Sequence, residues 1–106
     1  MSAEYMHIGI PVLTKKVGMT YNEWGKFWCS NVDDYDYKIE YLKFEEGTRF
    51  PDILAKRWHV AYKVDNMDPY LNDADLIICP PIALSETARL AFIEKDGAII
   101  ELFEEK

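Results

Sequence analysis

Two strand-like segments, each opening one half of the chain, share a pattern that limits how the chain can fold. Residues 7–12 (HIGIPV) and 59–64 (HVAYKV) both begin with histidine, followed by a β-branched residue and then a small one. Two copies of one supersecondary unit commonly close into a single sheet around a shared cleft, because neither copy can bury its apolar face alone. We therefore expect one small α+β domain built from two related halves.

Three strand-like segments each carry one residue that can bind a metal ion. His7 and His59 are the only histidines, and Glu101 lies between apolar neighbours in residues 97–104. An unpaired charge in such a strand would be costly. If the three strands lie side by side with these side chains on one face, two imidazoles and one carboxylate form a divalent transition-metal site. Such a site leaves positions open for substrate or water.

Length and composition indicate one globular domain. A chain of 106 residues, of which 49% are apolar, can enclose a single core. The formal net charge of -7 argues against a nucleic-acid-binding surface and against an anionic membrane surface. Cys29 and Cys79 are too few for a disulfide framework, and residues 1–16 lack the apolar core of a secretory signal. We expect a soluble cytoplasmic protein with no nucleic-acid or membrane partner.

The second half is predicted to contain a strand, a crossover and three further strands. Residues 65–72, which include Pro69, predict a short helical or turn-like crossover. Pro80-Pro81 interrupts the next strand and suits an edge, a bulge or a bend. Asp96-Gly97 predicts a hairpin turn, because these residues tolerate positive φ. The predicted strands are residues 58–64, 75–79, 87–94 and 98–104.

The first half reads as a shorter version of the second. It has a strand around His7, a segment with helical potential from Thr20 to Cys29, and a strand from Tyr37 to Glu45. Within the middle segment, an aromatic stripe at i, i+3, i+4 spacing predicts a core or dimer-interface helix face. That stripe is Trp24, Phe27 and Trp28.

These segments resemble the vicinal oxygen chelate superfamily, which includes glyoxalase I, methylmalonyl-CoA epimerase, extradiol dioxygenases and bleomycin-resistance proteins. The resemblance is carried by HIGIPV at residues 7–12, HVAYKVDNM at 59–67 and RLAFIEKDGAIIELFE at 89–104. It implies two βαβββ modules that form a curled mixed sheet around a cleft, with residues 1–56 as a shortened first module and 57–106 as the second. It also implies His7, His59 and Glu101 as metal ligands.

Lyase and isomerase members of that superfamily place a fourth ligand, Glu or Gln, on a strand of the first module. Glu40 is the residue that best matches it, and Glu45 is the runner-up. Strand alternation puts Glu40 and Glu45 on opposite faces, but neither face is cleanly apolar. The alternation therefore leaves open whether Glu40 is a ligand or the cross-strand partner of a lysine.

Three classes of function fit these residues. The first is a metal-dependent lyase or isomerase of the glyoxalase I or epimerase type, with zinc, nickel, cobalt or iron. Its ion holds the oxygens of a small substrate and stabilises an enediolate, while Glu101 or Glu40 moves a proton between adjacent carbons. The second is a metal-free, resistance-type protein that binds a small molecule. The third, ranked lowest because ring-cleaving members are larger, is a non-haem Fe(II) dioxygenase.

The short first half also predicts self-association. A small sheet with one reduced half leaves strand edges and apolar surface uncovered, and pairing with a second copy covers them. We therefore expect a homodimer.

Overall fold

A computed structural model describes residues 2–106 and shows a chain made mostly of strands. The chain forms two compact units: unit 1 contains residues 2–6 and His59–Lys106, and unit 2 contains His7–Trp58. The boundary lies within the first strand, which contributes to both units. The elements are β1 (Ala3–Pro11), β2 (Thr20–Asn22), β3 (Phe27–Cys29), η1 (Val32–Asp34), β4 (Ile39–Phe44), η2 (Asp52–Ala55), β5 (His59–Val64), α1 (Asp68–Asp73), β6 (Leu76–Ala83), β7 (Ala88–Lys95) and β8 (Ala98–Glu105).

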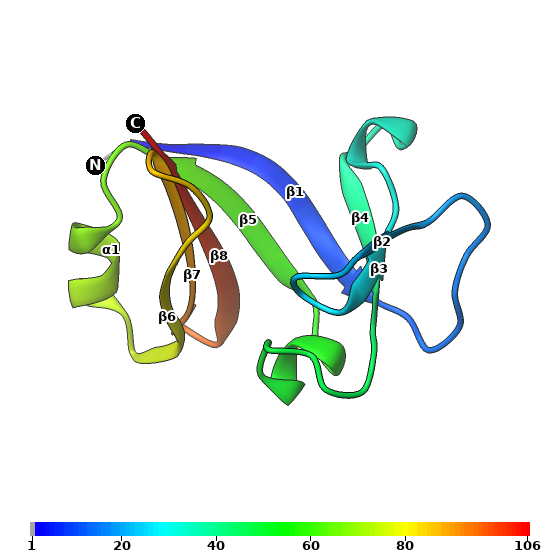
Figure 1. Ribbon diagram of the computed structural model, residues 1–106. Coiled ribbons are helices and arrows are strands. Elements are labelled where there is room, and N and C mark those ends of the chain that lie inside the picture. The colour runs from blue at the N-terminus through cyan, green and yellow to red at the C-terminus, as the bar shows by residue number, and fades with distance from the viewer. Residues whose placement is uncertain (1) are drawn as a thin grey trace. The chain divides into compact units, whose positions relative to one another are not determined.

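In unit 1 the strand order is β1-β5-β8-β7-β6. β5 runs parallel to β8, whereas β7 is antiparallel to both β8 and β6. Parallel neighbours cannot be joined by a hairpin. The chain therefore leaves β5, passes through α1, β6 and β7, and returns as β8; Figure 1 shows α1 beside these strands.

Two sequence predictions about these strands are confirmed. Asp96 and Gly97 have φ values of 52° and 84°, the pair of positive angles that a tight hairpin turn requires. They join β7 to β8, which pair from Lys95 with Ala98 to Ala88 with Glu105. Pro80-Pro81 lies in β6, an edge strand whose pairing with β7 shifts register on both sides of Cys79.

The predicted crossover is the short helix α1, and its apolar side covers the core of unit 1. Pro69 occupies the first turn, where its missing N–H leaves no helical hydrogen bond unmade. Its residues Tyr70 and Leu71 pack against a cluster of five buried side chains, which are Val64, Met67, Ala91, Ile93 and Leu102. A helix as short as α1 is unstable alone, so this packing holds it in place.

A buried carboxylate ties α1 to β8. The Glu104 side chain is 3% exposed and accepts hydrogen bonds from Arg89 Nε and Nη2, at 2.9 and 3.1 Å. The backbone N–H of Met67 donates a third bond at 2.8 Å. The bonds from Arg89, helped by that from Met67, hold the pKa of Glu104 below its ordinary value against the opposing effect of burial.

In unit 2 the strand order is β2-β3-β4-β1. β1 and β4 are parallel, and β3 is antiparallel to both β2 and β4. An aromatic cluster fills this unit around Phe50, which is buried and touches the rings of Trp24, Phe27 and Phe44.

The predicted helical segment from Thr20 to Cys29 is wrong, because it forms the hairpin β2-β3 instead. The Asn22 carboxamide accepts a hydrogen bond from the Gly25 N–H at 2.7 Å, which closes a turn rather than a helix. A Cβ atom at Gly25 would overlap the ring of Phe27. Tyr21 and Trp28 form a cross-strand pair with ring centroids 5.0 Å apart. Local turn chemistry and aromatic pairing thus override the helical spacing of the aromatic stripe.

The fold is a mixed sheet with few helices. Within unit 2, the described residues contain the 3-10 helices η1 and η2 but no α-helix. No helix among residues 2–106 is long and apolar enough to cross a membrane.

Replacing Glu104 with Gln tests the tie between α1 and β8. We expect the free energy of unfolding to fall by about 1–3 kcal/mol at neutral pH, because hydrogen bonds to a buried charge are lost. The folded-state pKa of Glu104 is lowered, so its stabilisation exists above the unfolded pKa and disappears as the pH falls through the folded pKa. Urea denaturation of parent and variant should therefore converge in acid.

The matched control is Glu105→Gln, at the neighbouring and more exposed carboxylate, which faces Lys63 at 3.6 Å. It should change the unfolding free energy by less than about 0.5 kcal/mol. Equal effects of the two substitutions would show that Glu104 has no special structural role.

Candidate metal site

Unit 1 places a histidine beside a glutamate on two parallel strands. His59 Nε2 lies 3.2 Å from Glu101 Oε1, and the two side chains are 2% and 15% exposed. Side chains alternate along β5 and β8, so the registered pair Ala61 and Glu101 lies on the same face as His59. The ring of Phe92 meets the imidazole of His59 edge to face, with centroids 5.3 Å apart.

Unit 2 repeats this arrangement with another pair. His7 Nε2 lies 3.5 Å from Glu40 Oε1, with side chains 9% and 22% exposed. β1 and β4 are again parallel, and Glu40 is registered with Gly9. Glu40 therefore faces His7 within unit 2.

The two His–Glu pairs have the same strand register. In each, the glutamate lies opposite the residue two places after the histidine, which is Gly9 in unit 2 and Ala61 in unit 1. Both of these residues are small, and a small side chain leaves room for the neighbouring carboxylate to lean towards the imidazole. The His, β-branched, small pattern of the sequence therefore has a structural meaning in both units.

The runner-up for the fourth ligand, Glu45, is engaged elsewhere. Its carboxylate accepts hydrogen bonds from Lys43 Nζ and from the indole nitrogen of Trp28, both at 2.9 Å. Both hydrogen bonds lower the pKa of Glu45, and the bond from Lys43 has the larger effect. Glu45 is therefore an ion-paired surface carboxylate.

The geometry of each pair suits two ligands of one ion. A charge-assisted N–H···O hydrogen bond is about 2.7–2.9 Å long. Ligand atoms each about 2.1 Å from one divalent ion are separated by about 3.0 Å in octahedral and about 3.4 Å in tetrahedral geometry. The separations of 3.2 and 3.5 Å lie close to this range, and imidazole nitrogen with carboxylate oxygen is a donor set that suits zinc, nickel, cobalt and iron.

His7 in unit 2, and His59 and Glu101 in unit 1, are side chains of the types that could hold a metal ion. Both histidines are buried. These are the three residues that the sequence pointed to, and Glu40 accompanies His7.

Two neighbours of these pairs were not found from the sequence. Phe92 pairs with Glu101 across β7 and β8. Pairing residues outward from the predicted Asp96-Gly97 turn, beginning with Lys95 and Ala98, would have identified it. Cys29 lies in the field of Glu40, and burial together with that negative charge raises the pKa of its thiol. The thiol of Cys29 could not be placed from the sequence because its segment was predicted to be helical.

Comparison with known proteins supports the fold alone. No family model matches the chain, and no curated protein matches it. Among solved structures, the chain is similar to the crystal structure of hypothetical protein BH1468 from Bacillus halodurans C-125, with a TM-score of 0.67. The two are 22% identical over 100% of this chain and 96% of that one.

Replacing His59 with Ala tests whether these residues bind metal. We expect the affinity for Zn²⁺ or Ni²⁺, measured by titration calorimetry, to fall by about 100-fold or more. Loss of a residue that only supports a ligand lowers metal affinity by about 10–100-fold, and loss of the ligand itself should lower it further. Circular dichroism should show that the strands persist. Glu105→Gln, which alters a carboxylate outside the pairs, should bind the ion as the parent does. Unchanged affinity in His59→Ala would mean that His59 is a packing residue.

Proposed function

We propose that the protein is a divalent-metal-dependent lyase or isomerase of the vicinal oxygen chelate type, acting on a small substrate with neighbouring oxygens. The observation that carries this proposal is the pair of His–Glu contacts, 3.5 Å for His7 with Glu40 and 3.2 Å for His59 with Glu101. The order strand, helix, three strands in residues 59–105 supports it, as it matches one module of that superfamily.

In this proposal the two His–Glu pairs supply the metal ligands. His7 and His59 supply neutral nitrogen ligands, while Glu40 and Glu101 supply oxygen ligands whose two negative charges balance a divalent cation. The ion, when bound, would hold the substrate's oxygens and stabilise the negative charge that develops on them. The presence of a carboxylate beside each histidine favours a lyase or isomerase over an oxygenase, for which two histidines and one carboxylate suffice.

Glu40 is the carboxylate that we assign as the proton carrier. Its side chain is 22% exposed against 15% for Glu101, and its distance to histidine is the longer of the two. A more accessible and more loosely held carboxylate can take a proton from one substrate carbon and return it to the adjacent carbon. Glu101, with the buried His59 beside it, would remain a ligand.

Glu40→Gln tests the assignment of the proton carrier. We expect the rate of proton exchange next to a substrate carbonyl to fall by about 100-fold or more, since positioned bases contribute that much. Deuterium uptake from heavy water into a panel of α-hydroxyketones and hemithioacetals, followed by NMR with metal added, measures it. Glu46→Gln, an exposed carboxylate in the same half of the chain, is the matched control. Exchange in Glu40→Gln at the control's rate would exclude Glu40 as the base.

A homodimer is the assembly that we propose. Several large apolar side chains are exposed, among them Leu13, Val17 and Leu76, at 92%, 106% and 55%. The edge strand β6 contains Pro80-Pro81, so side-chain contacts rather than strand pairing would join the copies. Sedimentation at tens of micromolar should show a dimer, because a specific interface persists at that order of concentration. A monomer throughout a concentration series would contradict the proposal.

A further inference from the structure

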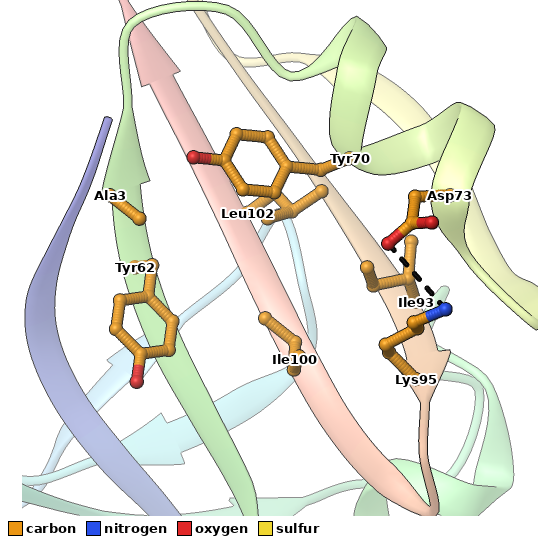
Figure 2. A pocket seen from close by; sticks show the side chains of 8 residues that line it. All are labelled: Ala3, Tyr62, Tyr70, Asp73, Ile93, Lys95, Ile100 and Leu102. Carbon is orange, nitrogen blue, oxygen red and sulfur yellow. Dashed lines mark ion pairs between the residues drawn. The ribbon is translucent and has the colours of Figure 1, made fainter. Parts of the chain in front are cut away.

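Unit 1 has a concave site, which we call the outer pocket. It lies between α1 and strands β5, β8 and β7 and has a volume of about 140 Å³. Ile93, Ile100 and Leu102 form its floor, and Tyr62 and Tyr70 stand around it (Figure 2). Neighbouring side chains alternate between the faces of β8, so Ile100 and Leu102 point away from the face that carries Glu101. The outer pocket is thus separate from the Glu101 carboxylate.

The walls of the outer pocket are held in place by packing. Tyr62 meets the ring of Tyr5 edge to face, with centroids 6.4 Å apart. Tyr70 packs against the buried cluster that includes Leu102 and Ile93, which are 1% and 3% exposed. Since these contacts exist in the protein alone, a ligand would not need to order the site.

One end of the outer pocket is polar. Lys95 Nζ lies 3.5 Å from Asp73 Oδ2, as the dashed line in Figure 2 shows. A neutral hydroxyl group can donate to the carboxylate and accept from the ammonium. Lys95 Nζ also lies 3.8 Å from Asp75 Oδ1, so two carboxylates face one ammonium at this end. Their excess negative charge disfavours a carboxylate ligand, whereas a neutral hydroxyl can use both members of the Asp73–Lys95 pair.

The size and lining of the outer pocket match a single ring. An apolar cavity of about 150 Å³ lined by aliphatic and aromatic side chains can bind benzene. Tyr62 and Tyr70 can meet a ring edge to face. We propose that the outer pocket binds one neutral phenol-type ring, with its hydroxyl at Asp73 and Lys95.

The test is a titration of the full-length ¹⁵N-labelled protein with phenol, followed by NMR. We expect saturable shifts at the amides of Ile93, Lys95 and Ile100, with a dissociation constant on the order of 1 mM, as suits so small a ligand. Benzoate should bind about 10-fold more weakly, because it loses a hydrogen bond and meets the negative charges of Asp73 and Asp75.

Two variants locate the binding. Ile100→Trp fills the floor, and Ala3→Phe adds bulk at an exposed position on the edge of the outer pocket. Each should abolish the phenol-induced shifts while leaving the rest of the spectrum dispersed. Val17→Trp adds the same indole at a fully exposed position in unit 2 and should leave phenol binding unchanged.

Three results would overturn the proposal. The first is the absence of saturable shifts near the solubility limit of phenol, and the second is binding that survives both pocket variants. The third is a shift of the same amides when the protein is concentrated without phenol, over the range in which sedimentation shows a dimer forming. In this case Ile100→Trp should show neither the shift nor the dimer. That result would assign the outer pocket to a side chain from a second copy.

Discussion

The parallel pairing of β5 with β8 is the interaction on which unit 1 depends. It sets Glu101 opposite Ala61 and so brings its carboxylate to His59. The same pairing forces the chain to leave the sheet and return, which creates α1 and the outer pocket beneath it. The candidate metal ligands of this unit and the outer pocket are therefore consequences of one hydrogen-bonded register.

Two glutamates on β8 show how a carboxylate's neighbours decide its role. Glu104 is almost fully buried, and Arg89 and the Met67 backbone supply its hydrogen bonds. Its charge is satisfied within the protein, and its role is structural. Glu101 faces an imidazole, a group that carries positive charge only when protonated. A divalent cation can bind the imidazole and the carboxylate at once, so the His59–Glu101 pair is a candidate for metal binding.

Unit 2 reaches a similar local arrangement with fewer elements. β1 and β4 are parallel like β5 and β8, and Glu40 stands to His7 as Glu101 stands to His59. The described part of this unit has no α-helix, and a hairpin with an aromatic cluster around Phe50 covers it instead. The repeated feature is thus the strand pair and its His–Glu contact, while the covering elements differ.

The sequence alone determined those features that depend on neighbouring residues: the strands other than β2 and β3, the Asp96-Gly97 turn, the irregular edge at Pro80-Pro81 and His7, His59 and Glu101 as candidate ligands. Residue type and period-two alternation suffice for these. Tertiary structure decided which glutamate accompanies each histidine, because alternation assigns a face but not a partner strand. It also decided that residues 20–29 form a hairpin, since Phe50, a distant residue, completes the aromatic packing that outweighs local helical spacing.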